Sequence, residues 1–161
     1  MPRNIDEATE LRAIPITGVG EVLPGDSVAD AIMAALRRQR LKLAPGDILV
    51  VKHKIVSKAE AQMVVLARVR PTPAARRWAA RYKLDARVVQ LAIKQAKRVV
   101  RRKHGVIITE TLHGLVCANS GVDVSNVDGG RCAALLPVDP DRSAREIRRA
   151  IRRSWVSPLR C

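Results

Sequence analysis

The feature that most constrains this chain is a run of small polar residues at 119–126, which separates apolar segments on either side. The run is Asn-Ser-Gly-Val-Asp-Val-Ser-Asn, with Asp123 at its centre. Apolar segments with strand-like composition precede it at 105–109 and 115–117 and follow it at 132–136. The pattern predicts a polar loop between strands. An Asp flanked by Ser and Asn suits a hard cation that prefers oxygen ligands. The same residue types form ordinary turns, and the local residues alone favour the turn.

The composition predicts one globular domain. The chain has 161 residues, of which 47% are hydrophobic and 28% charged, enough apolar material to bury a core. No apolar run approaches the length of a membrane span, and no signal-peptide pattern begins the chain. The three cysteines lack metal-ligand spacing, so we interpret them as thiols in a reducing compartment and expect a cytoplasmic protein without a membrane partner.

The formal net charge of +15 indicates an anionic partner or a solvated basic surface. Nucleic acid, a phosphorylated ligand and an acidic membrane surface are all compatible with this charge. Charge alone does not choose among them.

Periodicity and capping signals predict an α+β fold, with a mixed sheet of short strands flanked by about four helices. The expected helices lie at about 26–41, 72–82, 85–103 and 139–155. The expected strands lie at 13–16, 48–51, 63–66, 105–109, 115–117 and 132–136, and the segment 48–51 is expected to be buried because four β-prone apolar residues follow one another.

A lysine-rich segment follows the expected buried strand. Residues 52–60 include Lys52, Lys54 and Lys58, which are suited to phosphate oxygens. The glycines and the Gly-Lys-Ser/Thr ending of a P-loop are absent, and an exposed basic loop is the alternative. His53 alone does not identify a metal ligand or a base.

Several stretches together resemble the coenzyme F420-0:gamma-glutamyl ligases. The resemblance covers about 13–153, leaving 1–11 as a loose arm and 154–161 as an unrelated tail, with residues 12–153 as an incomplete ligase-like domain. It is carried by Gly-Asp-Ile-Leu-Val-Val at 46–51, Lys-Ile-Val-Ser-Lys-Ala-Glu at 54–60, Ile-Ile-Thr-Glu-Thr at 107–111, the segment 113–127, Leu-Leu-Pro at 135–137 and Asp-Pro-Asp at 139–141.

The resemblance implies an enzyme that adds L-glutamate to coenzyme F420-0, with GTP as co-substrate, Mg or Mn as the metal, and an acyl phosphate as intermediate. It implies that Asp123 binds the metal. It further implies nucleotide contacts, with Lys58 on a phosphate, at Val19, Gly20, Glu21, Val22, His53, Lys54, Lys58 and Asn126.

The chain departs from the family pattern in three places. Gly20 stands where the family often has proline, and Ala61 where it usually has glycine. Family members continue well beyond the part that this chain resembles, and they form intertwined homodimers. We therefore expect a truncated ligase with weak or absent activity on its own, which forms a homodimer or needs a second chain that supplies the rest.

Two other functions stay open at this point. The charge and the Arg-rich segment 145–153 are compatible with a nucleic-acid-binding protein, although stacking aromatics and known nucleic-acid motifs are scarce. An inactive remnant that still binds nucleotide is the other alternative.

Overall fold

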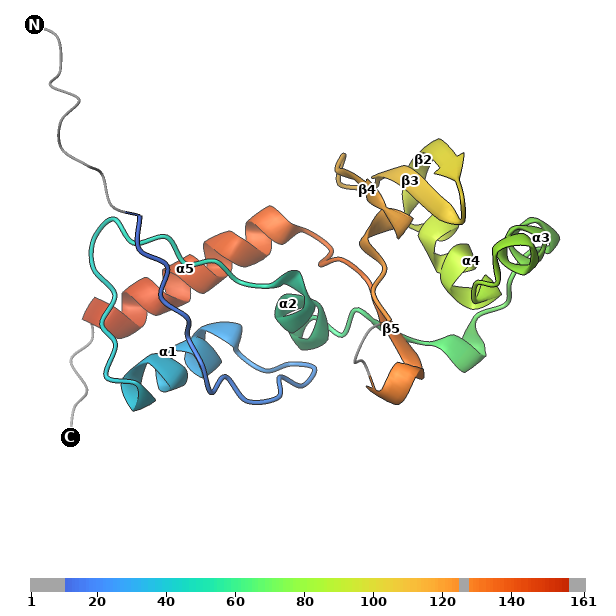
Figure 1. Ribbon diagram of the computed structural model, residues 1–161. Coiled ribbons are helices and arrows are strands. Elements are labelled where there is room, and N and C mark those ends of the chain that lie inside the picture. The colour runs from blue at the N-terminus through green and yellow to red at the C-terminus, as the bar shows by residue number, and fades with distance from the viewer. Residues whose placement is uncertain (1–10, 125–127, 157–161) are drawn as a thin grey trace, which may run out of the picture.

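The computed structural model describes residues 11–124 and 128–156. It is elongated, with two groups of elements joined by a small sheet (Figure 1). Within the described residues there are five α-helices and five strands, which confirms the α+β class. The strands form two antiparallel sheets in place of one mixed sheet. Across the described residues, no helix combines the length and the apolar character that a membrane span needs.

The first group consists of α1 (Val28–Arg38), α2 (His53–Ala59) and α5 (Pro140–Val156). Ser27 caps α1 by accepting a hydrogen bond from the Asp30 amide at 3.2 Å. The apolar stripe of α1 packs against Ile151 of α5, because residues at i, i+4 and i+8 share one helix face. This stripe is Val28, Ala29, Ile32 and Leu36.

The second group consists of helices α3 and α4 and a three-stranded sheet in the order β2-β3-β4. Small residues on α3 and Val89 on α4 pack with Ile107 of β3 to form its core. These elements span Pro73–Tyr82 (α3), Ala86–Lys94 (α4), Ala96–Lys103 (β2), Val106–Thr111 (β3) and Val116–Ala118 (β4).

A two-stranded sheet of β1 (Met63–Val65) and β5 (Cys132–Ala134) connects the two groups (Figure 1). Ala133 of β5 packs with Leu66 and with Leu91 of α4. Short 3₁₀ turns follow β1 at Leu66–Arg68 (η1), follow β4 at Asn119–Gly121 (η2) and precede β5 at Asp128–Gly130 (η3).

The helix expected at 85–103 ends early. Its first half is α4, but Gln95 closes that helix and Ala96 begins β2. The structural reason is a hairpin: His104 and Gly105 both have positive φ, at 47° and 83°, and Lys103 pairs with Val106. Two residues with positive φ make the tight turn that matches strand twist. Long-range pairing with β3 overrides the helical spacing of Val99 and Val100.

The segment 48–51 is not a buried strand, and this prediction was wrong. No ladder forms there, and Ile48 and Val50 are 88% and 87% exposed. Leu49 and Val51 on the alternate side pack against the α1–α5 core. The burial of its side chains alternates as in an extended chain, but no described segment pairs with its backbone. Residues 13–16, also expected as a strand, likewise have no strand pairing.

The lysine-rich segment expected as a loop is helical. Residues 53–59 form α2 without a side-chain N-cap. Ile55 and Ala59, four residues apart, pack against the α1–α5 core. Tertiary packing of this face therefore stabilises a helix too short to form alone.

Candidate functional site

The candidate site is organised by α2, whose outer face carries two lysines. Lys54 and Lys58 are four residues apart, so their side chains lie one above the other on the same face. Both belong to the segment that was predicted from sequence to be a loop and that is helical in the structure. The helix fixes the spacing of their ammonium groups, which a flexible loop would not do.

Each lysine contacts a carboxylate from a distant part of the chain. The Lys54 Nζ lies 2.8 Å from Asp123 Oδ2, and the Lys58 Nζ lies 3.1 Å from Glu21 Oε1. The Lys54–Asp123 pair is the more buried, with side-chain exposures of 17% and 27% against 25% and 73%. Four of the residues selected from sequence therefore converge on one helix face.

Asp123 is held by backbone pairing as an extension of the β1–β5 sheet. Its amide donates to the Ala134 carbonyl at 3.0 Å, and the Ala134 amide donates back at 2.8 Å. Ala134 also pairs with Met63 of β1. The carboxylate consequently projects from a strand-like position, where side-chain direction is set by the pleat.

The turn that precedes Asp123 is anchored by a buried hydroxyl pair. Ser120 and Thr109 are 2% and 0% exposed, and their hydroxyl oxygens lie 2.8 Å apart. The Ser120 amide donates to Thr109 Oγ1 at 3.1 Å, and Ser120 Oγ donates to the Ala92 carbonyl at 2.5 Å. This network ties the turn to β3 and α4. Sequence analysis did not identify Thr109 or Ser120 as positioning residues.

The segment 18–22 carries Glu21 to α2 without regular secondary structure. Its start is held by the last residue of α1 and by the C-cap residue that follows. Arg38 donates to the Gly18 carbonyl at 2.7 Å, and Gln39 donates to the neighbouring Thr17 carbonyl at 2.8 Å. Val22 is buried and Gly20 exposed. Of this predicted nucleotide segment, Glu21 is the residue with an ion pair to α2.

Ala61 follows Glu60, the C-cap residue of α2, and has the left-handed conformation, with φ of 55°. Its amide donates to the Lys58 carbonyl at 3.0 Å, and the Gln62 amide donates to the Ser57 carbonyl at 2.8 Å. These are the two hydrogen bonds of a Schellman C-cap, where glycine is the preferred residue. The alanine therefore keeps the turn, although at the steric cost of a Cβ in this conformation.

Glu60 links the end of α2 to the start of α5. Its carboxylate accepts hydrogen bonds from the Val138 amide, at 3.2 Å, and from the Ser143 hydroxyl. Glu60 ends one of the motifs that carry the family resemblance, but sequence patterns do not predict its contacts with Val138 and Ser143. Their role is to position α2 against α5.

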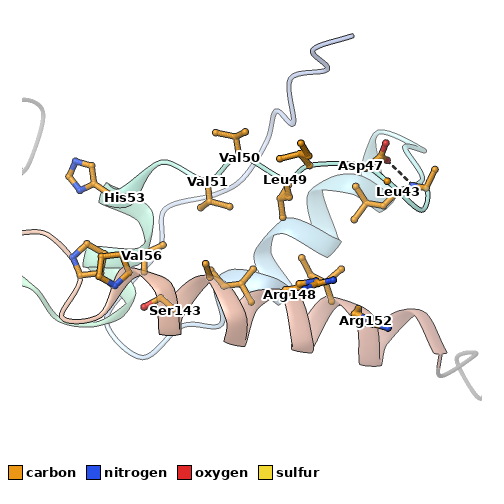
Figure 2. Close-up of a pocket in the computed structure, with 18 of the residues that line it drawn as sticks. Leu43, Asp47, Leu49, Val50, Val51, His53, Val56, Ser143, Arg148 and Arg152 are labelled. Atoms are coloured by element: carbon orange, nitrogen blue, oxygen red, sulfur yellow. Dashed lines mark hydrogen bonds between the residues drawn. The ribbon is translucent and has the colours of Figure 1, made fainter. Parts of the chain in front are cut away.

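An apolar groove of about 1310 Å³ lies between the extended segment 43–51 and α5 (Figure 2). His53, Val56 and Ser143 line it at the α2 end, while Arg148 and Arg152 line it along α5. Val50 points away from α5 and Val51 toward it (Figure 2). The groove thus borders the lysine face through α2.

His53 has a lowered pKa, chiefly because burial disfavours its charged form. The Asp123 carboxylate opposes this shift, and the charges of Lys54 and Lys52 add to it. Its Nδ1 is buried without a hydrogen-bond partner in the described structure. A neutral imidazole is therefore favoured at neutral pH.

We expect His53 to make stability depend on pH on the acid side. Because its folded-state pKa is below the ordinary 6.5, the unfolded chain binds the proton first as pH falls. The contribution of neutral His53 to folding stability is complete above pH 6.5, and it is lost as the pH falls from 6.5 toward the lowered folded-state pKa. Thermal unfolding from pH 5 to 8 should show a steeper acid-side loss for the wild type than for His53→Gln. Parallel pH profiles would contradict this assignment.

The described residues do not form a complete metal site. Within residues 11–124 and 128–156, no group of three or more His, Cys, Asp or Glu side chains is arranged to hold a metal ion. Asp123 supplies one carboxylate, and the Lys54 ammonium lies against it. Mg²⁺ is commonly held by one or two carboxylates plus substrate phosphates and water. Asp123 could therefore contribute one ligand, with the others coming from a bound nucleotide or from further polypeptide.

Asn126, predicted as a nucleotide contact, lies outside the described residues. The sequence predictions included four residues that lie together at α2 in the structure, namely Glu21, Lys54, Lys58 and Asp123. His53 is the first residue of the same helix. Sequence analysis did not foresee that Lys54 pairs with Asp123, since it assigned the lysine to the nucleotide.

Comparison with known proteins identifies related sequences. A model of the F420-0:gamma-glutamyl ligase family matches residues 18–158. A coenzyme F420:L-glutamate ligase of Methanopyrus kandleri is 42% identical over 142 residues, covering 88% of this chain and 54% of the relative. A protein of the same name from Methanothermobacter thermautotrophicus is 41% identical over 138 residues, covering 86% and 54%.

The matched family region contains Glu21, both lysines of α2 and Asp123. The chain spans about half the length of these relatives. The matches cover most of this chain, and sequence identities of 41–42% over that length show common family membership. This chain belongs to the F420-0:gamma-glutamyl ligase family.

Proposed function

We propose that this chain forms the nucleotide-binding part of a cytoplasmic ligase that joins L-glutamate to coenzyme F420-0, with GTP as the energy source. The observation that supports this most is the pair of lysines on one face of α2, each beside a carboxylate. Ammonium groups at fixed spacing can hold successive phosphate oxygens, and electrostatic positioning is the main catalytic requirement of phosphoryl transfer. The family names of the relatives give the substrates.

The Lys58–Glu21 ion pair can be exchanged for a phosphate contact at small cost. Exposed ion pairs contribute about 0–1 kcal/mol to stability, and the Glu21 side chain is largely exposed. A hydrogen bond from a lysine to a charged phosphate contributes about 1.5–3 kcal/mol. In the proposed complex Lys58 turns from Glu21 to a phosphate oxygen, and Lys54 remains between the nucleotide and Asp123.

The proposed reaction needs the F420-0 carboxylate to attack the GTP γ-phosphate. An acyl phosphate and GDP form, and the glutamate amine then displaces phosphate to give the amide. This chain's lysines neutralise the phosphate charge and orient it for in-line attack. A bound Mg or Mn ion would supply further charge neutralisation, with Asp123 as one of its ligands.

The groove along α5 is the place where we propose that further polypeptide binds. Ile48 and Val50 are exposed on a segment whose backbone no described residue pairs with, and such a segment can accept another strand. The relatives are about twice as long as the part they share with this chain. We propose that polypeptide equivalent to their remaining length occupies the groove and brings further metal ligands. A homodimer that covers it with a second copy is the competing outcome.

The proposal is tested by titrating GTP into the protein with and without Mg or Mn. We expect Lys58→Ala to weaken GTP binding about 10- to 100-fold, the equivalent of one charge-assisted hydrogen bond. Asp123→Asn should remove the dependence on metal, because it deletes the carboxylate while retaining the shape. Lys97→Ala is the matched control, since Lys97 forms a similar pair with Glu110 at 3.0 Å in the other group of elements.

Equal loss in Lys58→Ala and Lys97→Ala would contradict the proposed site. Ligation is followed in the same samples with F420-0 and L-glutamate, with and without a separate polypeptide equivalent to the relatives' remaining length. We expect ligation to require that polypeptide, because Asp123 is a single ligand. Metal-dependent GTP binding without ligation in either sample would favour a nucleotide-binding remnant. Light scattering of the chain alone measures its mass in solution. A mass of two chains would favour the homodimer as the occupant of the groove.

A further inference from the structure

The positive charge of the chain is concentrated away from the ligase site. Residues 66–104 contain 13 of the 30 Lys and Arg residues and one acid, Asp85. Asp85 is already neutralised by Arg87, whose NH2 group lies 2.6 Å from its carboxylate. This segment forms α3, α4 and β2, which lie at the opposite end of the molecule from α1 and α5 (Figure 1). The ligase chemistry does not account for this charge.

Three arginines of this segment converge on a small cleft. Arg77 and Arg81 lie four residues apart on α3, and Arg102 comes from β2. Together with Ala74 and Trp78 they line a cleft of about 270 Å³. The Arg102 guanidinium lies 5.7 Å from the centre of the Trp78 ring, a cation–π contact that orients it.

In the described part of the chain, no carboxylate lies within salt-bridge distance of Arg77, Arg81 or Arg102. Three like charges around one cleft repel one another unless an anion lies between them. Planar guanidinium groups match phosphate oxygens with two parallel hydrogen bonds. The cleft is thus preorganised for phosphate.

Protection of a sheet edge does not explain the cluster. β2 is an edge strand, and charges on such strands discourage pairing between molecules. Arg77 and Arg81, however, come from a helix and not from the edge. Stacking of bases is also not favoured, because Trp78 already packs against Tyr82 with ring centres 4.6 Å apart and against Arg102.

A lipid surface fits this face poorly. A helix that lies on a membrane presents large apolar residues to the lipid. The apolar side of α3, Ala75 and Ala79, is instead buried in the core. We propose that the face formed by α3 and β2 binds the sugar-phosphate backbone of nucleic acid, with Arg77, Arg81 and Arg102 as its central phosphate contacts. The binding is independent of base sequence and separate from the ligase site.

Fluorescence anisotropy with a labelled 20-base-pair duplex tests this at several salt concentrations. Each neutralised phosphate contributes about −0.9 to the slope of log affinity against log salt, and nonspecific binding falls at about 1–100 μM at physiological salt. We expect the triple variant Arg77→Ala, Arg81→Ala, Arg102→Ala to bind at least tenfold more weakly. Its salt slope should be reduced by about two to three units.

The matched control removes the same charge from α5, as Arg145→Ala, Arg149→Ala, Arg153→Ala, and should change affinity less than threefold. A second variant with lysine at positions 77, 81 and 102 keeps the charge, so it should retain most of the salt slope even if the alanine variant unfolds. An equal loss in the α5 control would show that only net charge matters and would overturn the proposal. So would binding to phosphatidylserine vesicles without binding to the duplex.

Discussion

Replacing Gly121 with Ala should destabilise the protein by about 2–6 kcal/mol. A Cβ at this position would lie 2.9 Å from Cγ and Cδ2 of Leu136, closer than such contacts occur. Gly121 also has a φ of 70°, a conformation that costs a non-glycine residue about 1–3 kcal/mol. Overpacking of a side chain adds about 1–3 kcal/mol. Urea unfolding, followed by circular dichroism, measures the sum.

Two further variants separate these causes. Gly114 has a similar φ of 81°, but nothing lies within 4 Å of an added Cβ, so Gly114→Ala should show the backbone cost alone. In a Leu136→Ala background the contact is absent, and Gly121→Ala should then cost about as much as Gly114→Ala. If Gly121→Ala cost no more than Gly114→Ala in the wild-type background, the contact with Leu136 would not be a constraint.

Replacing Thr109 with Val should destabilise the protein by about 2–4 kcal/mol. The change keeps the shape of the side chain but removes the acceptor of the buried Ser120 amide. A buried donor left without a partner costs about 1–3 kcal/mol, and the hydroxyl pair with Ser120 is lost as well. Because this network anchors the turn before Asp123, metal-dependent GTP binding should weaken in the same variant.

Thr109→Ser is the control, since it keeps the hydroxyl and removes one methyl group. That loss should cost about 1 kcal/mol, as for a buried methyl elsewhere, and should leave metal-dependent binding intact. A stability for Thr109→Val equal to that of Thr109→Ser would mean that water or another group satisfies the Ser120 amide.

Local signals predicted the elements whose boundaries are set locally. Ser27, Thr72 and Asp85 cap α1, α3 and α4 as their positions suggest. The turn at Gly114 joins β3 and β4 as predicted. In each case the deciding interaction, a capping hydrogen bond or a positive φ, lies within a few residues.

Elements decided by distant partners could not be predicted in this way. β2 has helix-favouring residues, and its pairing with β3 across His104 and Gly105 determines its conformation. Segment 48–51 has strand-favouring residues, but a strand needs a neighbour that supplies hydrogen bonds. Likewise, the meeting of Lys54 with Asp123 depends on how α2 packs beside the β1–β5 sheet.

The two ion pairs of α2 share one short helix. Lys54 and Lys58 are separated by one helical turn, about 6 Å along the axis, so a displacement of the helix moves both side chains. We expect a ligand that displaces α2 through Lys58 to move Lys54 too, and with it the surroundings of Asp123. Such linkage between two binding sites is reciprocal. We therefore predict that the proposed nucleotide and metal ion bind cooperatively.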